Sequence, residues 1–464
     1  MFTTKTYIQR RAELKKKMQN GIILFLGNTE ASINYAANYY KFRQDSTFLY
    51  YFGLDMPDVA AIIDVDENKE IIFGNDFEIN DIIWMGPQPK MKKLAASVGV
   101  KESMPINELQ KYCEQAISRK RKIHFIPQYR HHNIFMLHKL LGLAPSRVND
   151  YTSLPLIKAV SDQRAIKSQE EISEIEKAIS ISYQIHVSAM RFARPGMKER
   201  EVGGYIEGLA SSIGSSTSFP VIFTRHGEVF HNHYSSAKMK AGDLVINDSG
   251  AETELHYASD ITRTFPVSGK FTQKQKEVYQ IVLKAQMTAI KSIKPGVSWK
   301  AIHLKAATVI AQGLKELGLM KGNIKDAVEQ GAHALFFPHG LGHLLGMDVH
   351  DFENFGEDNF GYDEKNPRSK QFGLNYLRYA KTIKPGMVFT VEPGIYFVPA
   401  LIDKWKKEKK HAMFINYKKV DTYRDFTGIR IEDDVLVTKN GYRVLGRSIP
   451  KTVDEIEKIA GDKI

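Results

Sequence analysis

Four acidic residues that stand in or beside apolar, strand-forming segments constrain this chain more than any other feature of its sequence. Asp248 and Asp260 lie in one stretch, residues 243–266, whereas Glu392 and Glu432 lie in two separate stretches nearer the carboxyl end. A carboxylate in an apolar strand is costly unless it is paired with a cation or bound to a metal ion. The fold must therefore offset these charges, by a shared proton, a cationic side chain or a metal ion.

The stretch 243–266 predicts two strands joined by a turn. An apolar strand delivers Asp248, a turn with glycine and acidic residues reverses the chain, and a second strand delivers Asp260. If the strands pair, the two carboxylates point at one spot, where they must share a proton or hold a cation. Taken singly, Asp248 also fits a turn residue and Asp260 a cap.

A histidine cluster follows further along the chain. His339, His343 and His350 fall within twelve positions, among several glycines. Pro338 and these glycines favour an irregular or strand conformation over a helix. Neutral imidazole is a common ligand of divalent transition metals, although each histidine alone also fits an ordinary hydrogen-bonded residue.

Two further segments place glutamates near the carboxyl end. Glu392 ends an apolar strand, and Pro393 stops further strand pairing there. In the predicted strand 428–437 the side chains alternate, so that Arg430 and Glu432 share one face. A salt bridge with Arg430 is the structural alternative to metal binding by Glu432.

Together these segments offer four carboxylates and one imidazole, from Asp248, Asp260, His343, Glu392 and Glu432. Such an oxygen-rich set suits a pair of divalent cations, Mn²⁺ in the first place and Co²⁺ or Zn²⁺ as alternatives. A two-metal centre with a bridging hydroxide provides a nucleophile near neutral pH and polarises a scissile carbonyl. The composition of the site therefore indicates hydrolysis.

The rest of the chain divides into two parts near residue 160. The first part predicts α/β structure, with strands at 21–27, 59–65, 70–73 and 122–126. In the second part, a helix that starts at the capping box 168–171 ends at a Pro-Gly pair, 195–196, and another helix ends at 295–296, 100 residues later. Helical stretches at 198–212 and 299–317 follow the two breaks. This repeat suggests an internal duplication, although helices often end at Pro-Gly without one.

Composition excludes several classes of protein. The chain has 464 residues, 65 Lys and Arg against 53 Asp and Glu, a net charge of +12, and one cysteine, Cys113. We expect a cytoplasmic protein without disulfides, signal peptide or membrane span. The basic runs at 90–93 and 119–122 are the best candidates for nucleic-acid contact, but short runs are usually solvated faces, so we expect no nucleic-acid partner.

Four ordered motifs carry a resemblance to a known family. The motifs are DSGAE…SDITRT (248–264), HGLGH…DVH (339–350), VEPGIY (391–396) and IRIEDD (429–434). They resemble the pita-bread metallopeptidase family, which contains aminopeptidase P, prolidase and methionine aminopeptidase. Segment 42–53 resembles the amino-terminal domain that only the first two share. The resemblance implies an α/β domain over 1–160 and an α+β pita-bread catalytic domain with a pseudo-twofold duplication over 161–464.

The resemblance also implies roles for individual residues. Asp248, Asp260, His343, Glu392 and Glu432 match the metal ligands, with Asp260 and Glu432 bridging two metal ions. Glu392, His350 and His231 match catalytic positions, and His339 and Arg430 match substrate-binding positions. His233 competes with His231, although the distance to Asp248 favours His231. The sequence departs from the family in two places: Asp248 and Asp260 are one residue further apart than usual, and 356–381 is longer, which predicts a surface insertion.

The activity implied is cleavage of the bond between an amino-terminal residue and proline. We expect an Xaa-Pro aminopeptidase, or alternatively an Xaa-Pro dipeptidase, in which the metal-bridging hydroxide attacks and Glu392 relays its proton. The alternatives are a non-catalytic binding protein and a metal-free amidino hydrolase, both disfavoured because every ligand position is filled. Family members are often homodimers or homotetramers, which predicts a homo-oligomer.

Overall fold

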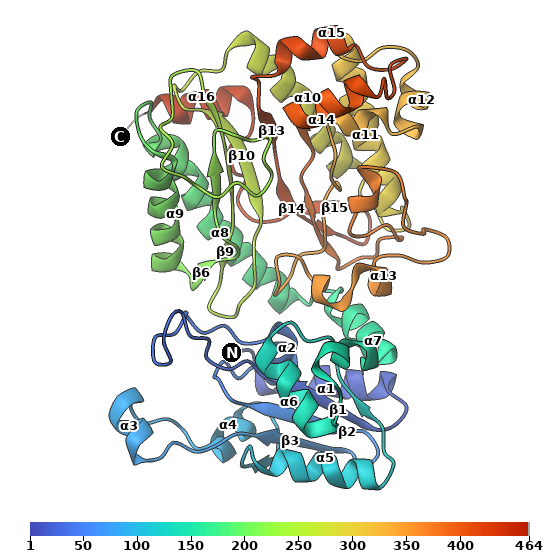
Figure 1. Ribbon diagram of the computed structural model, residues 1–464. Coiled ribbons are helices and arrows are strands. Elements are labelled where there is room, and N and C mark those ends of the chain that lie inside the picture. The colour runs from blue at the N-terminus through green and yellow to red at the C-terminus, as the bar shows by residue number, and fades with distance from the viewer. Residues whose placement is uncertain (463–464) are drawn as a thin grey trace. The chain divides into compact units, whose positions relative to one another are not determined.

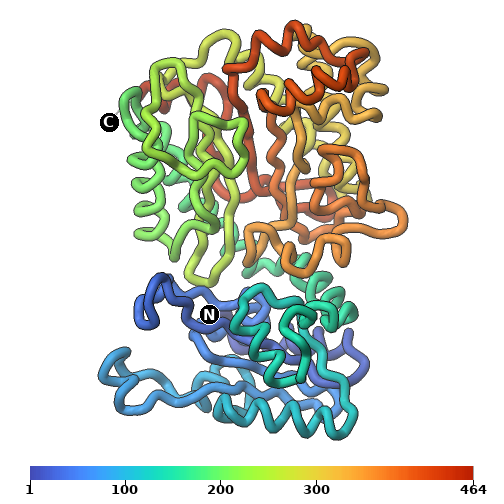
Figure 2. Tube along the Cα trace, viewed as in Figure 1, coloured from blue at the N-terminus to red at the C-terminus, as the bar shows by residue number. Residues whose placement is uncertain are grey.

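The chain forms two compact units. The computed structural model describes residues 1–462, and Figures 1 and 2 follow them from the amino to the carboxyl end. Unit 1 consists of residues 1–164 and 352–360, and unit 2 consists of residues 165–351 and the chain from 361 onward. The domain boundary predicted at 160/161 stays a prediction.

Unit 1 is built on a five-stranded mixed sheet with the strand order β4-β3-β2-β1-β5. The central strands are antiparallel, and both edge strands are parallel to their neighbours. The predicted buried strand, hairpin and short last strand are confirmed. The strands are β1 Ile22–Leu26, β2 Ala60–Asp64, β3 Lys69–Phe73, β4 Glu102–Met104 and β5 Ile123–His124. The helices are α1 Thr4–Lys17, α2 Ser46–Phe52, α3 Ile79–Met85, α4 Met91–Ser97, α5 Glu108–Ser118, α6 His131–Leu141, η1 Pro145–Tyr151 and α7 Leu154–Arg164, with η3 Glu353–Phe355 and α13 Glu357–Phe360 from the later segment.

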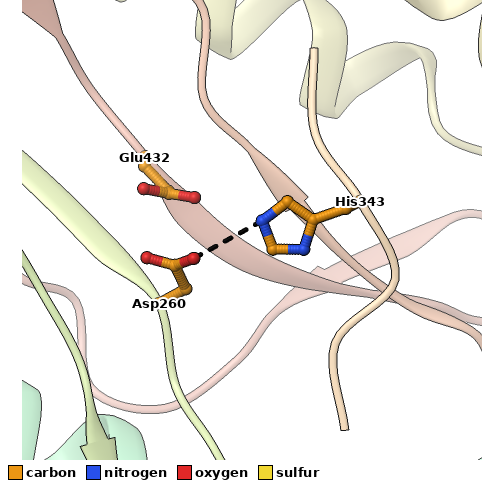
Figure 3. Close-up of side chains that lie close together, drawn as sticks. All are labelled: Asp260, His343 and Glu432. Atoms are coloured by element: carbon orange, nitrogen blue, oxygen red, sulfur yellow. Dashed lines mark ion pairs between the residues drawn. The ribbon is translucent and has the colours of Figure 1, made fainter. Parts of the chain in front are cut away.

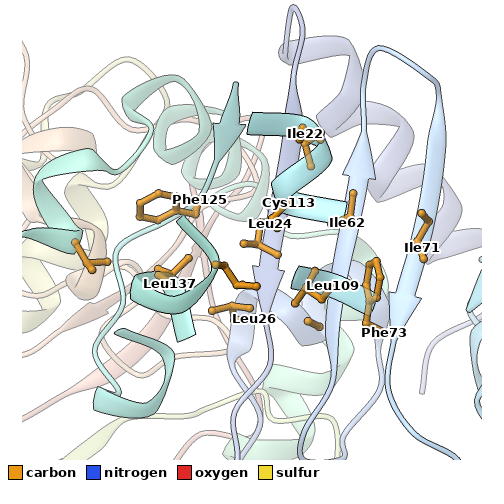
Figure 4. Close-up of a cluster of buried hydrophobic side chains, with 14 residues drawn as sticks. Ile22, Leu24, Leu26, Ile62, Ile71, Phe73, Leu109, Cys113, Phe125 and Leu137 are labelled. Atoms are coloured by element: carbon orange, nitrogen blue, oxygen red, sulfur yellow. The ribbon is translucent and has the colours of Figure 1, made fainter. Parts of the chain in front are cut away.

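The core of unit 1 follows from strand alternation. Ile22, Leu24 and Leu26 are two residues apart and turn to one face of β1, where they pack with Leu109 and Leu137 of helices α5 and α6 (Figure 4). Cys113 of α5 is buried in the same cluster. Burial of this thiol raises its pKa to about 12, so that it acts as a small apolar side chain.

The first half of unit 2 contains two helices followed by an antiparallel sheet with the order β10-β8-β7. Helix α8 starts with the predicted capping box, because the Ser168 and Glu171 side chains each accept a hydrogen bond from the other residue's backbone N–H. The predicted pairing of the strands that follow is confirmed, since β8 and β10 are antiparallel neighbours. The elements are α8 Gln169–Phe192, α9 Glu199–Ile213, β6 Ser216–Thr217, β7 Ile222–Thr224, β8 Leu244–Ser249, β9 Ala251–Glu252 and β10 Ile261–Pro266.

The second half of unit 2 also begins with two helices and leads to a sheet with the order β11-β14-β15. Its elements are α10 Gln273–Ser292, α11 Trp299–Glu316, α12 Ile324–Glu329, η2 Ala332–Leu335, η4 Leu374–Tyr376, β11 Val388–Val391, β12 Gly394–Tyr396, α14 Pro399–Lys407, α15 Tyr417–Val420, η5 Asp421–Tyr423, β13 Gly428–Arg430, β14 Asp433–Val437, β15 Tyr442–Val444 and α16 Val453–Gly461. Within residues 1–462, no helix is both long and apolar enough to cross a membrane.

Equivalent hydrogen bonds in the two halves support the predicted duplication. In the first half, Gly196 N–H donates to Met239 O and Glu199 N–H to Ala237 O. In the second half, the residues 100 positions later do the same: Gly296 N–H donates to Ile383 O and Trp299 N–H to Lys381 O. Figure 1 shows the pairs α8–α9 and α10–α11 at opposite sides of this unit, with β10, β13 and β14 between them.

The predicted continuous strand 428–437 is wrong, because it is divided into β13 and β14, which belong to different sheets. Val391 pairs with Asp433 and Gly394 pairs with Arg430, so the register is the same on both sides of the break. Pro393 lies inside the break and has no N–H to donate to a strand partner. The ladder therefore opens where Glu392 stands opposite Glu432.

The stretch 356–381 is not wholly a surface insertion, which corrects the prediction. Residues 356–360 belong to unit 1, and the remainder belongs to unit 2. Three of its large side chains, those of Leu374, Leu377 and Tyr379, are buried, because burial removes their apolar surface from water.

Two helix glycines allow a test of the packing in unit 2. A Cβ at Gly313 of α11 would come within 2.6 Å of the Ile281 side chain of α10, whereas a Cβ at Gly208 of α9 would meet nothing within 4 Å. We expect Gly313→Ala to destabilise unit 2 by about 1–3 kcal/mol. Gly208→Ala should stabilise it by about 0.5–1 kcal/mol through helix propensity. Scanning calorimetry measures both, and equal effects of the same sign would contradict this packing.

Candidate metal centre

Three buried side chains from distant parts of unit 2 meet at one point (Figure 3). Asp260 precedes β10, His343 lies in the irregular segment after η2, and Glu432 lies in the break between β13 and β14. One ligand atom from each lies within 4.8 Å of the others, and His343 Nε2 is 3.4 Å from Asp260 Oδ2. The histidine segment is not helical, as its glycines and Pro338 predict.

The other two predicted ligands lie beside this group. Glu392 Oε1 is 3.7 Å from His343 Nε2, and the strand register sets Glu392 opposite Glu432. Asp248 lies in β8 opposite Thr262, and its carboxylate is paired with the Arg430 guanidinium. The fold thus gathers the five side chains, with Asp248 held by an arginine.

Glycine and threonine residues fix the ligands locally. A Cβ at Gly342 would lie 1.9 Å from the backbone oxygen of Thr390, so only glycine allows the histidine segment to approach β11 this closely. Thr390 Oγ1 accepts a hydrogen bond from His343 N–H at 3.1 Å. On β10, Thr262 Oγ1 donates to Glu432 Oε2 at 2.7 Å.

The tautomer of His343 prepares it to bind a cation. Its Nδ1 lies 3.1 Å from Leu344 O, which can only accept, so Nδ1 carries the proton. The lone pair of Nε2 then points at the carboxylates of Asp260 and Glu392. Burial, and next the neighbouring His350 and Arg378, lower the pKa of His343 well below its usual value, so the ring is neutral.

The carboxylates repel one another in the metal-free protein. Burial and the charge of Glu432 raise the pKa of Asp260 well above its usual value, and burial and the charge of Glu392 do the same for the pKa of Glu432. Burial also raises the pKa of Glu392 to about 7, against the opposing charge of Arg430. Within residues 1–462, Asp260 Oδ1 and Glu432 Oε1 are buried without a hydrogen-bond partner. Buried acceptors of this kind, close to a neutral imidazole, fit divalent cations.

Tyr396 connects two of the predicted substrate-binding residues. Its hydroxyl lies 2.9 Å from His339 Nε2 and accepts a hydrogen bond from Arg430 Nη1, also at 2.9 Å. His339 Nδ1 donates to Gly340 O at 2.7 Å, so Nε2 accepts from the tyrosine. Arg430 also donates through Nε to Thr262 Oγ1. Its three nitrogens are therefore all engaged within the protein.

Of the remaining predicted histidines, His350 contacts a residue of the centre. The ring of His350 lies 4.3 Å from that of His343, in an edge-to-face arrangement. Burial lowers the pKa of His231, and the charge of Arg430 lowers it further. In His233, the alternative candidate, Nδ1 is 3.3 Å from the backbone oxygen of Val221.

Sequence reasoning missed several residues that support the centre. Thr262 could have been found, because it lies two positions after Asp260 and therefore on the same face of its strand. Asp434 accepts a hydrogen bond from Asp260 N–H at 3.1 Å, but no local pattern reveals a contact across 174 residues. Arg378, from the longer stretch, acts electrostatically on Glu392 and His343, and its sequence neighbourhood gives no sign of it.

Arg263 was also missed, although it stands inside the motif 259–264. It is fully buried, and its guanidinium donates to Glu432 O, to Ile449 O and to the Asp433 carboxylate. Asp433 in turn accepts from Lys451. This network fixes the backbone that presents Glu432.

Family models match most of the chain. A model of metallopeptidase family M24 matches residues 173–439, and a model of the aminopeptidase P amino-terminal domain matches residues 7–124. The first match contains every side chain of the centre.

Curated proteins and solved structures agree with these matches. A probable Xaa-Pro aminopeptidase of Botryotinia fuckeliana is 33% identical over 91% of this chain and 88% of that protein. The human Xaa-Pro dipeptidase is 32% identical over 97% of this chain and 91% of that protein. Escherichia coli aminopeptidase P, solved with the inhibitor Pro-Leu, superposes with a TM-score of 0.81 at 30% identity, covering 99% of this chain and 98% of that chain.

The raised pKa values predict how pH acts on the metal-free protein. A carboxyl whose pKa is raised by folding adds stability below its unfolded pKa, near 4, and this stability is lost as the pH rises through the folded value. Asp260→Asn removes the titrating group. The stability of the variant relative to that of wild type should therefore increase between pH 5 and pH 8. We expect the free energy of unfolding of Asp260→Asn, relative to that of wild type, to rise continuously across this pH range.

Thermal unfolding with a chelator present measures this increase, and Asp403→Asn, at an exposed ion pair with Arg424, is the control. The control should show no such trend. A stability difference between Asp260→Asn and wild type that stays flat from pH 5 to pH 8 would contradict the repulsion at the centre.

Proposed function

The chain belongs to metallopeptidase family M24, and on that premise we propose that it is an Xaa-Pro aminopeptidase, which hydrolyses the bond between an amino-terminal residue and proline. The observation that carries this proposal is the buried group of Asp260, His343 and Glu432, with Glu392 beside it. Two of its carboxylate oxygens lack a hydrogen-bond partner within the described residues, and the imidazole is neutral. These carboxylates and the neutral imidazole can bind cations, whereas the carboxylates repel one another.

We assign two divalent metal ions to this centre. Their ligands would be Asp248, Asp260, His343, Glu392 and Glu432. When bound, such ions lower the pKa of a water molecule and polarise a carbonyl oxygen. The excess of carboxylate over imidazole ligands supports Mn²⁺ ahead of Co²⁺ or Zn²⁺.

Glu392 is the residue that we propose moves protons. Its Oε1 lies 3.7 Å from His343 Nε2, beside the proposed metal ions, so its carboxylate can accept and return a proton there. Its Oε2 lies 4.0 Å from His339 Nδ1, which places the carboxylate at the edge of the histidine cluster. Glu392 would take the proton of the attacking water and pass it to the departing nitrogen.

The chemistry of proline explains why such a site suits this substrate. The X–Pro bond is a tertiary amide whose nitrogen carries no hydrogen. The substrate therefore has no N–H at this position that could donate a hydrogen bond to the enzyme. Recognition must come from side chains around the carbonyl and the departing ring. His231 and His350 would stabilise the developing charge, and His339 would contact the substrate.

The internal contacts of Arg430 bear on the choice between aminopeptidase and dipeptidase. A dipeptidase must hold the free carboxylate of proline, for which a bidentate arginine is well suited. Arg430 instead donates to Asp248, Tyr396 and Thr262 and therefore orients the centre. This favours the aminopeptidase, while an Xaa-Pro dipeptidase that uses another cation, such as Arg378, is the alternative.

Three further expectations remain part of the proposal. We retain a domain boundary at 160/161, a homodimer or homotetramer, and a cytoplasmic location. The last is supported by the single cysteine, Cys113, which is free and buried.

Substitution of the proposed ligands tests the assignment. Glu392→Ala and Asp260→Ala should each lower kcat/KM for an Ala-Pro substrate by about a hundredfold or more, because proton transfer or metal binding is lost. Metal analysis should find about two equivalents in wild type and fewer in Asp260→Ala. Either variant working at the wild-type rate would refute its assigned role.

A rate comparison distinguishes the two branches of the proposal. Because Arg430 is engaged within the protein, we expect Ala-Pro-Ala to be hydrolysed at least as efficiently as Ala-Pro with Mn²⁺ present. The measurement is kcat/KM for both peptides. A strong preference for Ala-Pro would instead identify a dipeptidase.

A further inference from the structure

A single buried glutamate closes the loop that carries His231. Glu199 is the first residue of helix α9 and is 1% exposed. Its carboxylate faces residues from both ends of the loop 225–235. The distances identify four hydrogen bonds to this one group.

One carboxylate oxygen holds the beginning of the loop, and the other holds its end. Glu199 Oε1 accepts from Arg225 N–H at 2.9 Å and from Thr224 Oγ1 at 3.3 Å. Oε2 accepts from the hydroxyl of Ser235 at 2.6 Å and from its N–H at 3.2 Å. An ionised carboxylate only accepts, so it matches these donors, whereas an amide would turn its own N–H groups toward some of them.

The hydroxyl of Thr224 continues this anchor into the loop. Its Oγ1 accepts from His226 N–H and from the Asn232 side chain, each at 2.9 Å. Further inside, backbone hydrogen bonds join near neighbours, such as Val229 N–H to His226 O. Glu199 and Thr224 therefore hold both ends of the loop, and the Tyr234 hydroxyl adds a hydrogen bond to Glu207 at 2.9 Å.

The anchored loop reaches residues beside the metal centre through Phe230. The ring of Phe230 lies 4.6 Å from that of Tyr396 and 5.6 Å from that of His339. His231 is the next residue in the chain, so the contacts of Phe230 also fix the backbone that carries His231. A shift of the loop would displace both side chains.

The second half of unit 2 uses the equivalent position in a similar way. Trp299, 100 residues after Glu199, is the first residue of α11, and its Nε1 donates to Gly342 O beside His343. The ring of Trp299 also stacks on Phe389 at 4.1 Å. In both halves, the residue at this position fixes a segment that carries a histidine of the centre.

We propose that Glu199 is a positioning residue, whose carboxylate clamps both ends of loop 225–235 and thereby holds His231 at the metal centre. The clamp rests on the geometry above, and its catalytic consequence rests on the proposed function. Glu199 touches neither the centre nor the substrate and acts only through the loop.

A double-mutant cycle tests the catalytic consequence. We expect Glu199→Gln to lower kcat for Ala-Pro-Ala about tenfold with a smaller change in KM, because a misplaced catalytic group costs chiefly rate. In a His231→Ala background, Glu199→Gln should change kcat less than about twofold, since the two residues act through one interaction. Metal content should stay at the wild-type level.

Glu457→Gln is the matched control. Glu457 is also a buried helix glutamate that accepts from a backbone N–H, that of Phe271, but it lies on α16 and has no contact with the loop. It should leave kcat unchanged in both backgrounds. An equal loss of kcat from Glu199→Gln with and without His231 would overturn the positioning role.

Amide hydrogen exchange tests the clamp independently of enzymatic activity. Amides of residues 225–235 should exchange faster in Glu199→Gln than in wild type or Glu457→Gln, while those of α8 and α10 stay protected. Unchanged exchange in the loop would overturn the clamp itself. If wild type hydrolyses neither peptide, the proposed function and the catalytic consequence both fail, whereas faster exchange would still establish the clamp.

Discussion

Repulsion between buried carboxylates is the constraint on which the rest of unit 2 depends. Asp260, Glu392 and Glu432 lie close together with little access to water, and burial raises the pKa of each. Like charges in such surroundings are tolerated only when a proton, an arginine or a metal ion offsets them. Arg430 offsets Asp248, and Thr262 donates to Glu432, but two carboxylate oxygens are left without partners within the described residues. The need for cations is thus built into the packing of the unit.

The duplicated architecture explains how so many acidic groups reach one point. The first half supplies Asp248 and Asp260 from neighbouring strands, and the second half supplies Glu392 and Glu432 from either side of an interrupted ladder. In both halves a long helix packs against the strands, α8 against β8 and β10 and α10 against β11 and β13. The carboxylates therefore lie in strands or directly beside strand ends, whereas the histidines come from irregular segments that are fixed separately, by Gly342 and Trp299 in one case and by Glu199 in the other.

Most of the secondary structure and the identity of the central side chains could be predicted from the sequence. Capping boxes, Pro-Gly breaks and apolar runs are local signals, and they located α8, α10, β1 and the β2–β3 hairpin correctly. The break at Glu432 could not be predicted from strand alternation, because it depends on Pro393 of the partner strand. Arg378, Asp434 and Glu199 were missed for the same reason, since each acts on residues far away in the sequence. Burial of Leu374 and Leu377 in the longer stretch likewise depends on tertiary contacts.

The hydrogen bond between Thr262 and Glu432 joins residues 170 positions apart, which has a consequence for how the chain reaches its native state. Closing so long a loop costs entropy before any contact at the centre repays it. Helices α8 to α11 and the hairpin of β8 and β10 involve nearer contacts and can form earlier. The centre is then completed late, when the two halves meet and their like charges approach. Cations present at that moment would offset the like charges as the two halves meet.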